Sequence, residues 1–161
     1  DATAEQTCRW WVELQQRALD SLPGTASDVL PRAYALTERG LAELALGRRT
    51  EARASLTEAL RHFETSGIDI VAERADASLG LGRLELAEGR HAAALPHLQR
   101  AETFWRELRA ESLWAAEATH WLAQGLAAAG RTEEAAKAAA RVRPLLERSP
   151  FPPHRELVAG R

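Results

Sequence analysis

Hydrophobic residues recur along most of this chain at intervals of three to four positions, which is the spacing of amphipathic α-helices. Two groups of leucines show it most clearly: Leu36, Leu41, Leu44 and Leu46, then Leu79, Leu81, Leu84 and Leu86. The pattern predicts helices over residues 5–21, 27–46, 50–65, 69–88, 91–107, 111–129 and 132–147. Since no segment alternates apolar and polar residues with a period of two, we expect no sheet.

One pattern occurs three times, at residues 40–48, 82–90 and 123–131. Each copy ends in a Gly-Arg pair, and these pairs begin at positions 47, 89 and 130, which are 42 and 41 residues apart. Small residues follow each pair at matching offsets: Ala52, Ala94 and Ala135, then Ala59, Ala101 and Val142. Agreement at several offsets indicates an internal repeat.

Each repeat has the pattern of a helix, a tight turn and a second helix. Gly47, Gly89 and Gly130 stand where the first helix must end, the position at which glycine takes up a left-handed conformation. Thr50 and Thr132 then fit the N-cap of the second helix, since acidic residues follow them.

Small residues on both helices predict that the two pack closely. Gly40, Gly82 and Ala123 lie midway along the first helices, and we expect them to contact Ala52, Ala94 and Ala135 on the second helices.

These positions resemble the tetratricopeptide repeat (TPR) family, and the resemblance covers roughly residues 28–147. The family favours a small residue midway along the first helix, glycine before the second helix and two alanines within it. The chain departs from the family in two ways. Its first helices carry Leu, Ser, Thr or Glu at most of the bulky aromatic positions, and its period is near 42 rather than about 34 residues. The long period is similar to the variant found in kinesin light chains and in sensor segments of bacterial transcriptional activators.

The resemblance implies an all-α fold, a right-handed α-α superhelix of stacked hairpins. We expect a single TPR-like domain over 1–161. Its parts are a half repeat at 1–22, repeats at 27–65, 69–107 and 111–147, and a tail or capping helix at 148–161. Because the chain opens on Asp1 and contains no methionine, we expect it to be a segment of a longer protein.

The resemblance also implies that the first helices line a concave groove that binds a peptide or a partner protein. The family's groove positions correspond here to Tyr34, Thr37, Leu41, Asp76, Leu79, Arg83, Glu117, His120 and Gln124. They lack the cluster of Lys, Arg and Asn with which chaperone-binding TPRs grip a carboxyl terminus. Three alternatives stay open: a spacer, a regulatory sensor segment of a bacterial transcriptional activator or kinase, and self-association through the exposed end repeats.

Composition narrows the function classes. The net charge of −2 is unlike that of nucleic-acid-binding proteins, and no apolar run is long enough to cross a membrane. The single cysteine, Cys8, agrees with a cytoplasmic location. The five histidines have no zinc-site spacing, so we expect neither a metal nor a cofactor. Recognisable catalytic motifs are missing, and the glycines of the segment 79–83 lie within a predicted helix, so we expect no enzyme.

Tryptophans are the remaining candidates for binding. Trp105, Trp114 and Trp121 are expected in the core between hairpins, with an aromatic binding anchor as the alternative. Trp10 and Trp11 are adjacent on one helix and must point in different directions.

Overall fold

The computed structural model describes residues 2–68 and 71–159, and these residues form an all-α fold without strands, as the sequence predicts. The α-helices are α1 (Ala2–Ser21), α2 (Val29–Ala45), α3 (Arg49–Ser66), α4 (Ala72–Ala87), α5 (His91–Arg109), α6 (Leu113–Ala128), α7 (Thr132–Glu147) and α8 (Pro152–Ala159). A short 3-10 helix, Ala26–Asp28, precedes α2.

The helix bounds lie within a few residues of the predicted ones, with two differences. Helix α1 begins at Ala2 rather than at residue 5, and the predicted tail contains the additional helix α8. The first two residues of the predicted helix 69–88, residue 1 of the half repeat and residues 160–161 of the tail lie outside the described residues.

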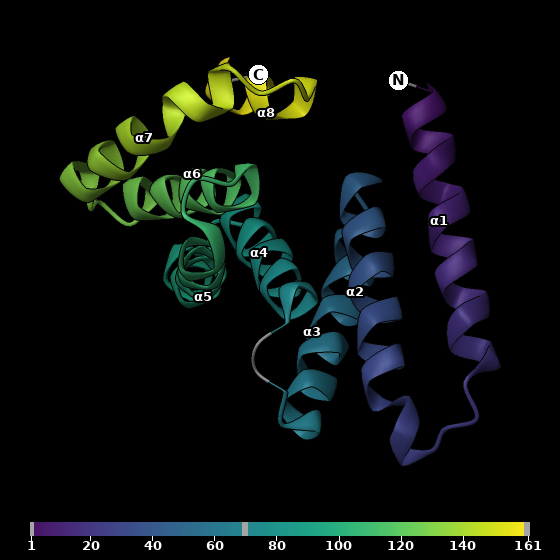
Figure 1. Cartoon of the computed structure of the whole chain (residues 1–161). Coiled ribbons are helices and arrows are strands. Elements are labelled where there is room, and N and C mark those ends of the chain that lie inside the picture. Colours follow the sequence, from purple (N-terminus) through teal and green to yellow (C-terminus); the bar gives the residue numbers. More distant parts are fainter. Residues whose placement is uncertain (1, 69–70, 160–161) are drawn as a thin grey trace.

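Consecutive helices pair into antiparallel hairpins, α2 with α3, α4 with α5 and α6 with α7. Neighbouring hairpins contact each other mainly through the second helix of one and the first helix of the next, α3 with α4 and α5 with α6. Since α2 also contacts α4, and α4 contacts α6, these three first helices follow one another in a row. Figure 1 shows α1 and α8 at the two ends of this row, with α3 and α5 on the other side of it. Such a stack buries each hairpin's apolar face only against its neighbours.

The three turns inside the hairpins have the same geometry. Gly47, Gly89 and Gly130 have φ of 72°, 74° and 80°, the left-handed region that favours glycine. At the first of these turns, the Gly47 N–H donates to the Leu44 carbonyl and the Arg48 N–H donates to the Glu43 carbonyl. This pair of bonds is a Schellman motif, and it recurs at the other two turns.

The predicted threonine caps are wrong. The N-cap residues of α3 and α7 are Arg48 and Arg131, and neither side chain makes a capping hydrogen bond. The Schellman turn brings the chain directly into the next helix, so Thr50 and Thr132 already lie within the first turn. A side-chain N-cap does occur at the start of α6, where the Ser112 hydroxyl accepts a hydrogen bond from the Ala115 N–H at 3.1 Å.

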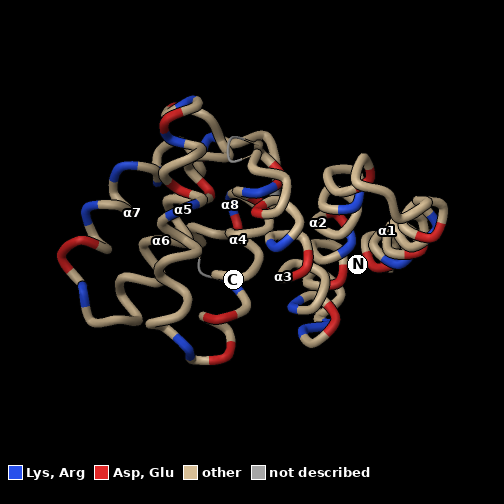
Figure 2. Tube along the Cα trace, turned by 90° about the horizontal axis from the view of Figure 1, so that it is seen from below, with Lys and Arg blue, Asp and Glu red and all other residues tan. Residues whose placement is uncertain are grey.

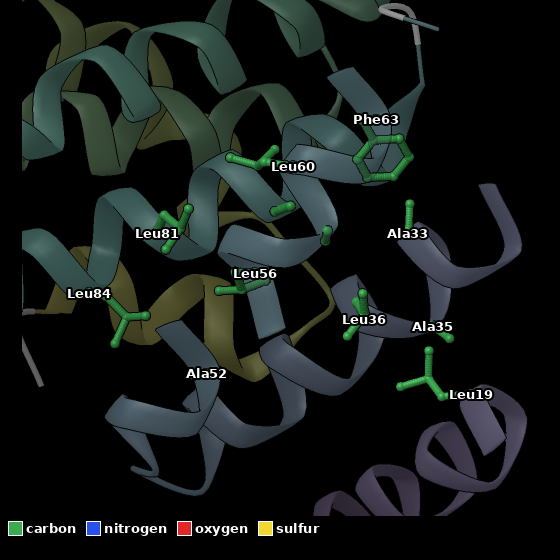
Figure 3. Close-up of a cluster of buried hydrophobic side chains, with 12 residues drawn as sticks. Leu19, Ala33, Ala35, Leu36, Ala52, Leu56, Leu60, Phe63, Leu81 and Leu84 are labelled. Carbon is green, nitrogen blue, oxygen red and sulfur yellow. The ribbon is translucent and has the colours of Figure 1, made fainter. Parts of the chain in front are cut away.

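The largest buried cluster joins α2, α3 and α4 (Figure 3). Phe63 and Leu56 are its largest fully buried side chains from α3, and Leu84 reaches it from α4. Three smaller clusters continue along the chain. The core is therefore distributed along the stack, as in a solenoid.

Glycines of the first helices make room for a leucine of the second helix. A Cβ on Gly40 would lie 2.6 Å from Leu56 Cγ, and one on Gly80 would lie 2.8 Å from Leu56 Cδ1. Leu98 of α5 is enclosed in the same way by Gly82 and Gly125. The close approach agrees with the prediction for Gly40 and Gly82, but their nearest neighbours are these leucines rather than the alanines one turn earlier.

Two buried glutamates are held by hydrogen bonds. Glu43 accepts from Arg39 Nε at 2.8 Å and from Ser55 Oγ at 2.7 Å. Glu85 stands 42 positions later and pairs with Arg53 and Arg90. Burial of these carboxylates is tolerated because charged and polar donors surround them.

Charged residues of both signs are interspersed over most of the helices, whereas α6 carries Glu117 alone (Figure 2). This distribution agrees with the low net charge.

Candidate functional site

Four of the predicted groove residues gather where α4 faces α6. Arg83 comes from α4, while Glu117, His120 and Gln124 lie on successive turns of α6. Arg83 Nη1 lies 3.9 Å from Glu117 Oε1, and Arg83, His120 and Gln124 line one cavity. The repeat offset of 41 or 42 residues places these side chains in the same register on neighbouring helices.

The cavity has a volume of about 590 Å³ and lies among the first helices of the hairpins. Its apolar wall comes from α2, α4, α6 and α8, and consists of Leu44, Leu86, Ala87, Trp121, Ala128 and Leu157. Arg49 and Arg83 supply two cations to its lining. A cavity of this size with an apolar wall and a few polar groups has the composition of a binding site.

Arg83 is the central polar group of this cavity. Its guanidinium lies 4.7 Å from the centre of the Trp121 ring, a cation–π arrangement. Burial lowers the pKa of Arg83, and the nearby Glu117 carboxylate opposes that shift. Among the described residues, Glu117 is its only ionic partner, and 3.9 Å is too long for a hydrogen bond. Within the described part of the chain Arg83 makes no hydrogen bond to another side chain, so its N–H groups can donate to an added acceptor.

Glu117 and His120 complete the polar side of the site. Glu117 also faces His154 of α8, with 3.5 Å between His154 Nε2 and Glu117 Oε2. His120 is buried, its ring stands edge-on to Trp121 at 5.7 Å, and burial lowers its pKa. The neutral imidazole is therefore favoured, which leaves the arginines as the cations of the cavity.

A second cavity of about 540 Å³ shares His120, Gln124 and Leu157 with the first and extends between α6, α7 and α8. Ala139 lines it at the position 41 residues after Leu98. The leucine that fills the space between hairpins in the earlier repeats is thus replaced by alanine, and space remains.

Asp76 lies on α4, further toward its N-terminal end. Its carboxylate accepts from Trp105 Nε1 at 3.2 Å. Burial raises the pKa of Asp76 to about 7; the Trp105 hydrogen bond opposes this shift, and the charges of Glu117, Glu38 and Glu73 add to it. The carboxyl group therefore changes charge near neutral pH.

Asp76 should make folding stability depend on pH. Its pKa is about 7 in the folded chain against the ordinary 3.8. Stability from the protonated carboxyl is fully present below pH 3.8 and is lost as the pH rises through about 7. In urea unfolding, the difference in free energy of unfolding between Asp76→Asn and the unmodified chain should shift in favour of Asp76→Asn when the pH is raised from about 5 to about 8. An equal difference between the two chains at both pH values would contradict the assignment.

The remaining predicted groove residues serve mainly to pack the hairpins. Thr37 is fully buried and donates its hydroxyl to the Ala33 carbonyl at 2.9 Å, and Leu79 is buried as well. A partner cannot reach these two side chains in this structure, which corrects the expectation for them. Tyr34 and Leu41 are half-buried against the main cluster, Tyr34 with its ring centre 5.8 Å from that of Phe63.

Several residues of the cavity were not among the predicted ones. Arg49 belongs to the first turn of a second helix, and Leu157 belongs to α8. Trp121 was expected in the core, and it does pack against the α4–α5 cluster, but it also lines the cavity. Its place one residue after the groove position His120 is the signal that could have identified it.

The other tryptophans divide between core and surface. Trp105 is buried, as predicted, whereas Trp114 is 58 % exposed and the expectation of a core position is wrong. Trp11 donates to Glu38 Oε2 at 3.2 Å while its neighbour Trp10 is exposed, so the two differ in environment.

Within residues 2–68 and 71–159, no three His, Cys, Asp or Glu side chains are grouped so that they could hold a metal ion. None of the helices described there has the length and apolar character needed to cross a membrane.

The successive hairpins, their identical glycine turns and the distributed core define a helical repeat protein of the solenoid class. Residues 37–110 match the family model of the tetratricopeptide repeat. This segment, from α2 to the end of α5, therefore consists of tetratricopeptide repeats. No curated protein matches it. Repeats of this family are non-catalytic scaffolds that generally mediate protein–protein interactions.

Proposed function

We propose that the face formed by α2, α4 and α6 binds a segment of a partner protein. The observation that carries this proposal is the environment of Arg83. Its guanidinium stands in a cavity of about 590 Å³ with no ionic partner nearer than 3.9 Å among the described residues. An acceptor from a partner would supply the hydrogen bonds that Arg83 lacks.

The cavity lining supports a partner segment with an acidic group beside an apolar one. Arg83 and Arg49 would attract the acidic group, and the Gln124 amide can both donate and accept hydrogen bonds. Leu44, Leu86 and the Trp121 ring provide the apolar surface.

The proposal includes the long-period form of the repeat. The first helices begin at Val29, Ala72 and Leu113, and the Gly-Arg turns recur after 42 and 41 residues. Repeats over 27–65, 69–107 and 111–147 place α1 as an unpaired second helix and α8 as an unpaired first helix. Longer helices widen the face available to a partner.

Reversing the charge of Arg83 should abolish binding at this face. Peptides selected from a random-peptide library on the unmodified chain should bind Arg83→Glu at least about tenfold more weakly, because a desolvated charge contact is replaced by repulsion. Isothermal titration calorimetry measures the loss. Arg17→Glu on α1 is the matched control: Arg17 is exposed and lies outside the cavity lining, so affinity should be unchanged.

If the selected peptides bind Arg83→Glu and the unmodified chain equally well, the binding face lies elsewhere. Circular dichroism of both variants checks that helicity is retained.

A further inference from the structure

A third pocket lies outside the proposed protein-binding face, between the α5–α6 turn and the α7–α8 turn. Its volume is about 690 Å³, and its apolar lining consists of Leu113, Trp114, Phe151 and Pro153. Arg109, Glu111, Ser112 and His154 line the remainder. The volume falls within the range of about 300–1,000 Å³ that is typical of small-molecule sites.

Two aromatic side chains are exposed at this pocket although much of the chain's apolar surface is buried. Trp114 is 58 % exposed and Phe151 is 56 % exposed. Exposed aromatic residues that gather in one hollow, rather than standing singly, are typical of binding sites.

One face of the Trp114 ring packs against another aromatic ring. It stacks on Trp105 with 5.7 Å between ring centres and 19° between ring planes. Trp105 itself is buried, its indole N–H donates to Asp76, and Phe104 meets it edge-on at 5.2 Å. A flat ring with one face packed and the other at a pocket is a preorganised stacking surface, which lowers the entropic cost of binding.

The polar groups nearest the aromatic wall are already occupied within the chain. The Ser112 hydroxyl caps α6, and His154 faces Ser149 through Nδ1 and Glu117 through Nε2. Recognition in the pocket would therefore depend on ring stacking and apolar contact, since the two charged side chains of its lining, Arg109 and Glu111, are exposed to solvent.

We propose that this pocket binds a small planar aromatic molecule, stacked on Trp114 and flanked by Phe151. The site is distinct from the cavity around Arg83: no residue lines both. The chain would thus carry a small-molecule site in addition to its protein-binding face.

Indole, a neutral planar ring, is the probe that tests this proposal. In ¹⁵N NMR titrations of the full chain, indole should shift the Trp114 side-chain N–H signal, and Trp114→Leu should weaken binding at least about tenfold. Trp10→Leu is the matched control, because Trp10 is 57 % exposed and belongs to α1, which contributes no residue to the pocket. Phe151→Ala should weaken binding less than Trp114→Leu does.

Cyclohexanol, which is apolar but not planar, should bind more weakly than indole. The proposal is overturned if millimolar indole leaves the Trp114 signal unchanged. It is also overturned if Trp114→Leu and Trp10→Leu bind indole equally, or if cyclohexanol binds as tightly as indole. Since Trp114 is largely exposed, its replacement should leave the fold intact, which circular dichroism verifies.

Discussion

Leu98→Ala is expected to lower the free energy of unfolding by about 2–5 kcal/mol. Leu98 is fully buried and lies between Gly82 of its own hairpin and Gly125 of the next one. Its removal would leave a cavity at the contact between two hairpins, where a solenoid obtains its cooperativity. Urea unfolding followed by circular dichroism measures the loss. Leu108→Ala is the control, because Leu108 is 61 % exposed and the same change there should stay within about 0.5 kcal/mol.

Gly82→Ala tests the same contact from the other side. A Cβ at position 82 would lie 2.5 Å from Leu98 Cδ2 and 3.3 Å from the Leu98 backbone nitrogen, so the change should cost about 1–3 kcal/mol. In the Leu98→Ala background the two side-chain clashes are absent, and the 3.3 Å contact with the backbone nitrogen remains. The preference of helices for alanine over glycine, about 0.5–1 kcal/mol, then offsets much of the cost, so Gly82→Ala should destabilise this background less than it destabilises the unmodified chain. Gly82→Ala that stabilises the unmodified chain would contradict the packing described here.

Phe63→Ala is expected to destabilise the chain by about 3–5 kcal/mol. Phe63 is the largest fully buried side chain and belongs to the cluster that joins α2, α3 and α4. The Tyr34 ring of α2 also rests against it, so the substitution would loosen the packing between the two helices of the first hairpin. The measurement is the shift of the urea midpoint at constant m-value.

Phe151→Ala is the matched control for Phe63→Ala. Phe151 is 56 % exposed, so the same deletion should change the free energy of unfolding by no more than about 0.5 kcal/mol. Equal effects at the two positions would mean that Phe63 is not part of the core.

Most of the fold could be predicted because its signals are local and recur. Glycine at 47, 89 and 130 fixes where each first helix ends, since few other residues adopt positive φ there. The N-caps of the second helices were predicted at Thr50 and Thr132 but lie at Arg48 and Arg131. The prediction failed because the Schellman turn runs directly into the next helix, which therefore begins earlier than expected. Helix α8 was recognised only as an alternative for the tail, because its eight residues are too few to show a hydrophobic period.

The candidate site could be predicted in part for the same reason. Arg83 and Gln124 share a register set by the repeat, so the family's groove positions carried over to them. Thr37 could not be judged from sequence, since its hydroxyl bonds to its own helix and so tolerates full burial. Leu157 lines the cavity only because of where α8 packs, and the position of α8 depends on contacts between residues that are far apart in the sequence.

Chemical-shift mapping of a selected peptide on the ¹⁵N-labelled chain shows directly which face of the stack the partner contacts. The largest changes are expected at Arg83, the Trp121 indole and Gln124, which line the cavity among α2, α4, α6 and α8. Changes confined to the outer faces of α3 and α5 would show that the chain binds its partner on the opposite side, and would contradict the proposed function.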